Sequence, residues 1–297
     1  MREGIAVGLV GCGRWGRFIL RDLLSLGCRV SVVARSDASR AAASEGGAAA
    51  IVASTSELPE VEGVVVAVPT QTHAQICDEA LARGVPVFVE KPLSSDPADA
   101  ARLGGEQRLF VMDKWRYHPG IEALAGIARE GELGLVVGLR STRIGWGNPH
   151  DVDAVWILGP HDLALAVEIL GELPEARSAV ADSVGGVAHG LVGLLGERPW
   201  HALEVSSRSV ERRREVTLVC EDGVAMLPSG YSDHLVVRRE GSEPKQREVS
   251  TEFPLLRELR AFVEHLDGGP PPKSSAAEGA AIVQRIAELR ALAGLAV

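Results

Sequence analysis

Two segments of the sequence carry side chains that could handle a proton and the charge on an oxygen atom. Glu90-Lys91-Pro92 follows the apolar run 85–89, and His161-Asp162 lies within WILGPHDLALAVEILG (residues 156–171). A lysine ammonium hydrogen-bonds a hydroxyl or carbonyl oxygen and stabilises charge that develops there. A neutral imidazole removes a hydroxyl proton, and its protonated form returns it. Lys91 and His161 are therefore the candidate catalytic residues; the alternatives are a loop lysine paired with Glu90 and a surface histidine.

Pro160 predicts where a helix begins around His161. Proline suits the first turn of a helix, and Asp162 is favourable at that positive end. We therefore expect a helix over 160–170 with His161 in its first turn. The helix dipole disfavours a protonated ring there, which keeps His161 neutral, as a general base requires.

A glycine-rich segment, GLVGCGRWGR (residues 8–17), adds a third kind of chemistry. Its glycines fit G-x-G-x-x-G, which allows a tight turn, bare backbone against a pyrophosphate and close helix–strand packing. The helix that starts there directs its N–H groups at the phosphates. A strand before and a helix and second strand after supply the context that the motif requires, which favours a dinucleotide site over a turn without ligand. The predicted contacts in this turn are Gly11, Gly13, Arg14, Trp15 and Gly16.

The end of the second strand predicts which dinucleotide binds. In SVVARSD (residues 31–37), Arg35 and Ser36 occupy the place where an acidic residue would bind the ribose hydroxyls. A guanidinium can pair with a 2′-phosphate instead, and Arg40 could add a second positive charge. This predicts NADP in preference to NAD. The alternative is a surface arginine, with Asp37 binding the ribose.

The elements that position these residues alternate between strand and helix over the first 120 residues. Predicted strands cover 4–10, 29–33, 50–52, 63–68 and 85–89, and helices cover 15–26, 39–45 and 76–81. This alternation is typical of a doubly wound parallel sheet, the Rossmann arrangement. Since ligands bind outside the carboxyl ends of such strands, residues 69–73 and 90–92 should border the cofactor.

The pattern changes after residue 120. A helix over 121–130, a long strand over 133–144 and the helix over 160–170 precede short strands between 179 and 249, and helices over 255–266 and 276–292 follow. We predict a Rossmann domain over 1–118 and an α+β domain on an open, mostly antiparallel sheet over 119–297. The last helices could pack back on the first domain.

Composition excludes several classes of protein. The net charge is −9, and the basic cluster ERRRE (residues 211–215) is flanked by acids, so we expect a solvated loop or strand end there and no nucleic-acid partner. We expect no membrane span, because every apolar run is too short, and no signal peptide. Four cysteines without CxxC spacing predict reduced thiols in the cytoplasm, and no metal site is expected.

Several motifs in order resemble one known family. GLVGCGRWG is followed by AVPTQTHAQICDEALARGVPVFVEKPL, by DVDAVWILGPHDLALAVEILG and by the closing helices FPLLRELRAFVEHL and EGAAIVQRIAEL. Together they resemble the Gfo/Idh/MocA oxidoreductases, the relatives of glucose–fructose oxidoreductase and inositol dehydrogenase. The resemblance implies a hydride transfer between NAD(P) and a carbonyl or secondary alcohol of a sugar, cyclitol or related polyol, and a homodimer or homotetramer formed through the second sheet.

The resemblance also implies roles for individual residues. Lys91 would polarise the reacting oxygen, His161 would transfer the proton, and Glu90 would lie near the nicotinamide, with a cis bond before Pro92. Pro69, Thr70 and His73 would contact the cofactor, although Thr70 and His73 are equally suited to capping a helix. Many relatives carry an aspartate where this chain has Ile157. Asp162 is the expected substitute that orients the ring or binds substrate, and Asp151 and Asp153 are alternatives.

Substrate contacts are expected in DKWRYHPGI (residues 113–121), which follows another strand end. The candidates are Arg116, Tyr117 and His118, together with Arg143, Trp156, Lys91 and His161. Trp115 and Tyr117 could instead be packing residues. Two further functions remain open: reduction of an imine, a bilin or a dihydrodiol on the same scaffold, and a dinucleotide-binding regulator without turnover, against which the retention of Lys91 and His161 argues.

Overall fold

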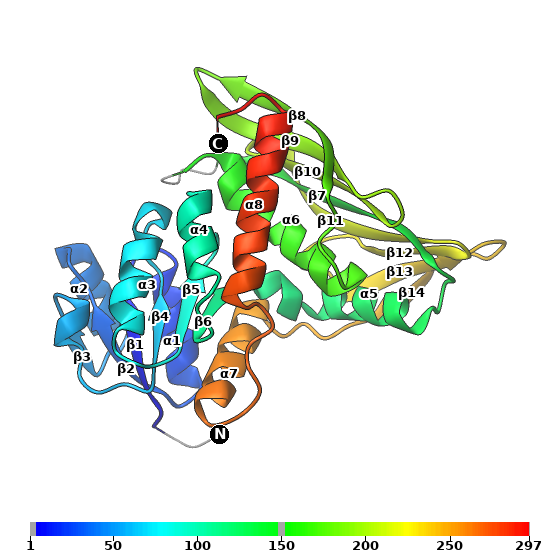
Figure 1. Cartoon of the computed structure of the whole chain (residues 1–297). Helices are drawn as coiled ribbons and strands as arrows, with labels where there is room; N and C mark the ends of the chain where they lie inside the picture. Colours follow the sequence, from blue (N-terminus) through cyan, green and yellow to red (C-terminus); the bar gives the residue numbers. More distant parts are fainter. Residues whose placement is uncertain (1–3, 148–151, 297) are drawn as a thin grey trace. The chain divides into compact units, whose positions relative to one another are not determined.

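The computed structural model describes residues 4–147 and 152–296 (Figure 1). The chain forms two compact units, each built from two stretches of sequence. Unit 1 comprises Met1–Lys114 and Phe253–Ala280, and unit 2 comprises Trp115–Glu252 and Ala281–Val297. The segment 253–280 near the C-terminus thus returns to the first unit. The assignment of these units to cofactor and substrate stays a prediction.

Unit 1 is built on a six-stranded parallel sheet with the order β3-β2-β1-β4-β5-β6. Its strands are β1 (Ala6–Val10), β2 (Arg29–Val33), β3 (Ala50–Val52), β4 (Gly63–Val66), β5 (Val87–Glu90) and β6 (Leu109–Met112). β4 is buried along its whole length, since valines fill both faces of a sheet that helices cover on each side. This strand order confirms the predicted doubly wound fold.

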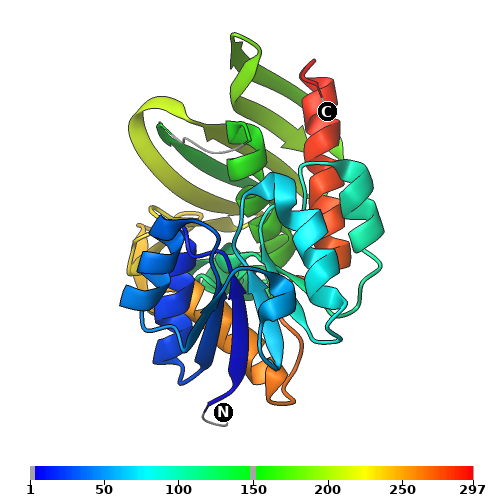
Figure 2. The same cartoon turned by 90° about the vertical axis from the view of Figure 1, so that its left-hand side faces the viewer.

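Helices cover both faces of this sheet (Figures 1 and 2). They are α1 (Gly16–Ser25), α2 (Asp37–Glu45), α3 (His73–Leu81), α4 (Pro97–Leu103) and α7 (Pro254–Leu266), with short 3-10 turns η1 (Thr55–Glu57) and η2 (Thr70–Thr72). α7 packs against α1, and the ring of Phe262 stacks on Phe88 of β5 with the centroids 4.9 Å apart. The segment 253–280 returns to unit 1 because α7 buries an apolar face on this sheet.

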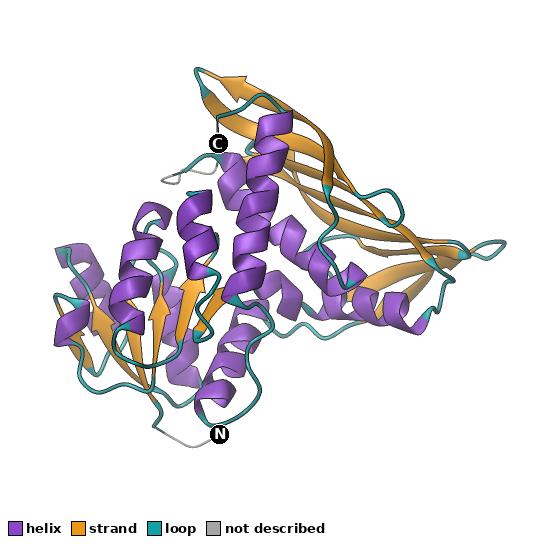
Figure 3. Cartoon of the chain, viewed as in Figure 1, coloured by secondary structure: helices purple, strands orange, loops and turns teal. Residues whose placement is uncertain are grey.

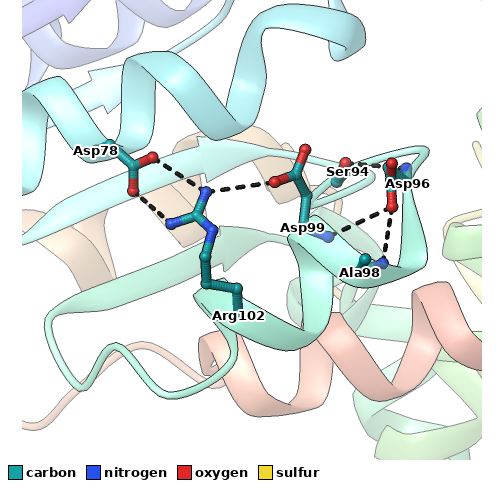
Figure 4. A network of polar contacts seen from close by, with 6 residues as sticks. All are labelled: Asp78, Ser94, Asp96, Ala98, Asp99 and Arg102. Atoms are coloured by element: carbon teal, nitrogen blue, oxygen red, sulfur yellow. Dashed lines mark hydrogen bonds and ion pairs between the residues drawn. The ribbon is translucent and has the colours of Figure 1, made fainter.

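Helix α4 was not predicted from the sequence, although its start carries a recognisable signal. The Asp96 carboxylate accepts hydrogen bonds from the N–H groups of Ala98 and Asp99 at 2.7 and 3.4 Å, and Pro97 occupies the first turn. Figure 4 shows this cap beside Arg102, whose guanidinium pairs with Asp78 of α3 through two bonds of 2.8 and 3.0 Å. An aspartate before a proline is a common helix start.

Unit 2 is built on an eight-stranded sheet, drawn in orange in Figure 3, with the order β14-β13-β12-β11-β7-β10-β9-β8. Its strands are β7 (Val136–Trp146), β8 (Ala176–Val184), β9 (Val187–Leu195), β10 (Trp200–Ser206), β11 (Arg208–Cys220), β12 (Gly223–Leu227), β13 (His234–Arg239) and β14 (Lys245–Glu248). β7 and β10 run parallel, and the other neighbouring pairs are antiparallel, which confirms the mostly antiparallel prediction.

One face of this sheet is covered by α5 (Pro119–Glu130) and α6 (Ala154–Leu170). A short turn, η3 (Lys114–Tyr117), leads into α5, and α8 (Ala276–Leu292) begins in unit 1 and continues in unit 2. The opposite face of β8 and β9 leaves apolar side chains exposed, namely Val180, Val192 and Leu194. The two faces of the sheet therefore differ: one forms the core of the unit, and the other remains apolar and uncovered along β8 and β9.

The predicted start of α6 is wrong, and the error concerns His161. α6 begins at Ala154 because the Asp153 carboxylate caps it, accepting from the N–H groups of Val155 and Trp156 at 3.1 and 3.3 Å. Pro160 lies inside the helix, so His161 and Asp162 lie in its middle rather than in its first turn. The dipole argument for a neutral His161 therefore fails, because that effect is confined to the terminal turn.

The four cysteines Cys12, Cys28, Cys77 and Cys220 are free and buried. Burial raises the pKa of each thiol, to about 11 for Cys28 and about 12 for Cys77. They are structural apolar residues rather than nucleophiles. Among the helices of the described residues, none has the length and apolarity of a membrane span.

Candidate active site

The glycine-rich turn between β1 and α1 has the shape of a phosphate cradle. Gly11 adopts a φ of +96°, and a Cβ there would collide with the carbonyl oxygen of Ala67. A Cβ on Gly16 would collide with the carbonyl oxygen of Gly11, whereas Gly13 faces open space. No side chain among the described residues caps α1. Open backbone at Gly13 and an uncapped helix start fit a pyrophosphate.

Positive charge gathers at the end of β2. Arg40 donates to the carbonyl oxygens of Ala34 and Arg35 at 3.2 and 2.8 Å, which holds its guanidinium beside the strand end. The exposed Asp37 carboxylate lies 3.6 Å from the same guanidinium. The Ser36 hydroxyl caps α2 by accepting from the N–H of Ser39 at 3.2 Å. With two arginines against the single Asp37 carboxylate, the end of β2 carries a net positive charge.

His73 connects two of the predicted cofactor-binding segments. The ring Nδ1 lies 2.8 Å from the carbonyl oxygen of Pro92, and Nε2 lies 3.0 Å from that of Val68. His73 is the first residue of α3, and its ring contacts these two loops rather than capping the helix. Thr70 is buried in the adjacent turn η2. The Lys91–Pro92 peptide bond is cis, as expected.

Carboxyl groups and cations surround Lys91 at the end of β5. Burial raises the pKa of Glu90, while the charges of Lys91 and Lys114 oppose that rise. Glu258 of α7 is 1% exposed, and its pKa is raised well above the ordinary value by burial and then by the neighbouring Glu90. The Lys114 ammonium lies 3.8 Å from the ring centroid of Trp15. No pattern in the sequence indicates Glu258, because α7 reaches this place only through the tertiary fold.

In unit 2, several predicted site residues pack around the indole of Trp115. His118 stacks on it at 5.1 Å between centroids, and His161 meets it edge-on at 6.4 Å. The Arg143 guanidinium lies 4.1 Å from the Trp115 centroid. Asp162 accepts a 2.5 Å hydrogen bond from Nε of Arg143, and both side chains are buried. Trp115 is buried in the core of this unit, and the substrate contact predicted for the buried Tyr117 stays a prediction.

Other predicted substrate residues are engaged within unit 2. His118 caps α5, since its Nδ1 accepts from the N–H of Gly120 at 3.0 Å. Its Nε2 therefore carries the proton and donates to the carbonyl oxygen of Gly230 at 3.2 Å. Arg116 forms a buried ion pair of 3.2 Å with Glu168. Their contact with substrate stays a prediction.

The carboxylates considered for orienting His161 differ in their surroundings. Asp153 caps α6 and also pairs with Arg290 at 2.7 Å, and Arg290 in turn lies over the buried Trp156. Asp162, the next residue after His161, points to Arg143. Asp151 lies outside the described residues. The role predicted for Asp162, orienting the ring or binding substrate, stays a prediction.

The basic cluster at 211–215 is only partly the solvated segment that we expected. Arg214 lies within β11, is half-buried and stands directly opposite Arg143 of β7 in the sheet. Arg212 and Arg213 are exposed. Alternation along a strand turns every second side chain inward, which sets Arg214 apart from its neighbours. Within residues 4–147 and 152–296, no group of three or more His, Cys, Asp or Glu side chains could hold a metal ion.

Comparison with known proteins identifies the family. Residues 5–106 match the model of GFO_IDH_MocA, the oxidoreductase family with an NAD-binding Rossmann fold. This match covers the first five strands of the parallel sheet, β1 to β5, and so relates unit 1 to the family's NAD-binding domain. Inositol 2-dehydrogenase from Streptomyces avermitilis is 29% identical over 206 residues, which are 60% of each protein. UDP-N-acetylglucosamine 3-dehydrogenase from Acidithiobacillus ferrooxidans is 30% identical over 182 residues, 58% of this chain and 56% of the relative. The chain thus matches less than two thirds of these curated relatives' length.

Solved structures extend the similarity in fold to nearly the whole chain. The UDP-N-acetylglucosamine 3-dehydrogenase of Acidithiobacillus ferrooxidans superposes with a TM-score of 0.86 at 22% identity, covering 98% of both chains. A levoglucosan dehydrogenase in complex with NADH and levoglucosan gives 0.88 at 15% identity, again covering 98% of both. These similarities establish the two-sheet architecture.

Proposed function

We propose that this chain is an NADP-dependent oxidoreductase that acts on a carbonyl or secondary alcohol of a sugar, cyclitol or related polyol. The observation that carries this proposal is the glycine cradle at Gly11–Gly16 on the same sheet edge as Lys91. The names of the relatives, which act on inositol and a nucleotide sugar, support the substrate class.

Several residues of unit 1 would hold the dinucleotide. The backbone at Gly13 would bind the pyrophosphate. Arg35 and Arg40 would pair with a 2′-phosphate, which is the basis for proposing NADP rather than NAD. Arg14, Trp15, Pro69, Thr70, His73 and Glu90 complete the proposed contacts. The bound nicotinamide supplies or accepts the hydride.

Lys91 would bind the reacting oxygen of the substrate. Lys91 directly follows β5, and the ring of His73 contacts the carbonyl oxygen of the next residue, Pro92, at 2.8 Å. In this role the ammonium donates a hydrogen bond to the oxygen and stabilises the negative charge that develops there. Burial raises the pKa of the adjacent Glu90, and the positive charge of Lys91 opposes that rise.

His161 would move the proton of the same oxygen. In an oxidation the neutral imidazole removes the hydroxyl proton, and in a reduction the imidazolium returns it. Trp115 packs edge-on against the ring, and Asp162 fixes Arg143 beside that indole. Lys91 belongs to unit 1 and His161 to unit 2.

Replacing Lys91 separates the enzyme from a cofactor-binding regulator. We expect Lys91→Ala to bind NADPH within about threefold of the wild-type Kd and to lose kcat by about a hundredfold or more, the range for a lost transition-state contact. Fluorescence titration with NADPH and NADH, and initial rates with a panel of polyols, measure both effects. Unchanged turnover in Lys91→Ala would refute the catalytic assignment, and tighter binding of NADH would refute the preference for NADP.

We also propose that the chain self-associates through the exposed face of β8 and β9. Val180 and Val192 stand opposite each other in the sheet, and Leu194 lies beside them on that face. A second copy would cover this apolar surface. Light scattering should give a mass at a multiple of 31.4 kDa, and a monomer mass would exclude the interface.

A further inference from the structure

Two arginines stand directly opposite each other on the helix-facing side of the unit 2 sheet. Arg143 of β7 pairs in register with Arg214 of β11. Like charges in this arrangement normally destabilise a sheet. Asp162 neutralises Arg143, but in the described part of the chain Arg214 has no carboxylate within ion-pair distance. A net positive charge is therefore held inside this unit.

Both guanidinium groups also have hydrogen-bond donors left over. Nη1 of Arg143 and Nε of Arg214 are buried and have no partner among the described residues. Arg143 is only 3% exposed. A guanidinium remains charged in proteins, and a buried donor without a partner is costly. A buried donor without a protein partner therefore calls for an explanation, and a bound anion is one.

The surroundings of Arg214 are predominantly positive. Its pKa is lowered first by burial and then by the charges of Arg143 and Arg212, while Tyr231 and Asp162 act weakly in the other direction. Arg212 contributes a third cation at the rim, where its Nη2 lies 3.5 Å from the Tyr231 hydroxyl. Glu215, the next residue along β11, directs its side chain to the opposite face.

This positive cluster lies beside the proposed acid–base residue. The Arg143 guanidinium covers the Trp115 ring at 4.1 Å, and the same ring contacts His161. All of these groups belong to unit 2. A negatively charged ligand group held by the arginines would therefore lie close to His161.

We propose that Arg143 and Arg214 bind an anionic group of the substrate, a carboxylate or a phosphate. The substrate is then a sugar acid or a phosphorylated sugar or cyclitol rather than a neutral polyol. Oδ1 of Asp162, which also has no partner in the described chain, is free to accept a neighbouring substrate hydroxyl. This inference rests on the proposed function for the sugar or cyclitol class of the substrate and for the role of His161.

A binding measurement tests the anion site without turnover. The full chain is saturated with NADPH, so that the glycine-rich turn is occupied, and titrated with inorganic phosphate by calorimetry. We expect Arg214→Gln to raise the Kd for phosphate by about ten- to a hundredfold, as for a lost charge-assisted bond. Arg213→Gln is the matched control, because it removes one charge from the same strand on the exposed, opposite face. Equal phosphate affinity in the wild type and Arg214→Gln would overturn the proposal.

Matched substrates then identify the anion. Rates with NADP are compared for D-glucose, D-glucuronate and glucose 6-phosphate, and for the corresponding neutral and phosphorylated inositols. We expect kcat/KM for one charged compound to exceed that of its neutral partner by about tenfold or more, with Arg214→Gln raising KM rather than lowering kcat. The comparison of D-glucuronate with glucose 6-phosphate shows whether the arginines prefer a carboxylate or a phosphate. A neutral compound that is preferred and insensitive to Arg214→Gln would contradict the anion site, whereas absence of turnover with all compounds would count against the proposed function alone.

Discussion

The two units hold their candidate site residues by different means. In unit 1 the backbone does most of the positioning, through a glycine at positive φ, a cis proline and a histidine that contacts two carbonyl groups. In unit 2 buried ion pairs do so: Arg143–Asp162 joins β7 to α6, Arg116–Glu168 joins η3 to α6, and Arg290–Asp153 joins α8 to the start of α6. A backbone conformation can hold a residue in place when nearby solvent or side chains change. Removing one partner of a buried ion pair, in contrast, leaves the other charge buried without compensation.

The largest expected effect comes from breaking a buried pair in unit 2. Asp162→Ala leaves the Arg143 guanidinium buried without its carboxylate, which should cost about 3–5 kcal/mol of unfolding free energy. Urea unfolding of the full chain, followed by tryptophan fluorescence, measures this loss. A cost below about 1 kcal/mol would show that the pair is hydrated and that the contrast between the units is false.

The second expected effect is an opposite pH response of the two units. Burial lowers the pKa of His201 in unit 2 to about 3, so the folded ring stays neutral while the unfolded ring takes up a proton below 6.5. Unit 2 should therefore lose stability as pH falls, by about 2 kcal/mol between pH 7 and 5. In unit 1 the pKa of Glu258 is raised, so its folded carboxyl keeps a proton that the unfolded one releases. The stability that this retained proton gives to unit 1 is present below the ordinary pKa of the carboxyl and is lost as pH rises.

Peptide-resolved hydrogen exchange at pH 5 to 8 distinguishes these responses. Protection of β10, where His201 accepts or donates a 2.9 Å bond with Ser141, should weaken toward pH 5. Protection of α7 should weaken toward pH 8, and Glu258→Gln should abolish that trend. A shift of both regions in the same direction would show that the titration of these two groups does not govern local stability.

The smallest effect is expected for an exposed pair in unit 1. Arg102 and Asp78 join α4 to α3 through two bonds, but each side chain is about half exposed (Figure 4). Asp78→Ala should cost about 0.2–1 kcal/mol, because solvent and salt screen the pair. The same urea assay applies, and 0.5 M NaCl should remove most of the difference. A loss comparable to that of Asp162→Ala would remove the distinction between buried and exposed pairs.

These differences also explain which parts of the structure could be predicted from the sequence. The glycine spacing and the strand that precedes it are local patterns, so the Rossmann fold followed from short segments. The cis bond before Pro92 was expected only because the motifs resemble the Gfo/Idh/MocA family. The start of α6 did not follow, because Pro160 resembles a helix start while the decisive cap is Asp153. The helix α4 had a comparable cap at Asp96 that was overlooked.

The sequence by itself determined which residues could form the phosphate cradle, because glycine conformational freedom and strand–helix periodicity are properties of neighbouring residues. Only the tertiary structure decided which charges meet. Arg143 and Arg214 are more than sixty residues apart in the chain, and the register of β7 and β11 brings them opposite each other. Glu258 approaches Glu90 because α7 packs its apolar face on the first sheet. The energy of such charges depends on burial and distance, and both are fixed by packing rather than by local sequence.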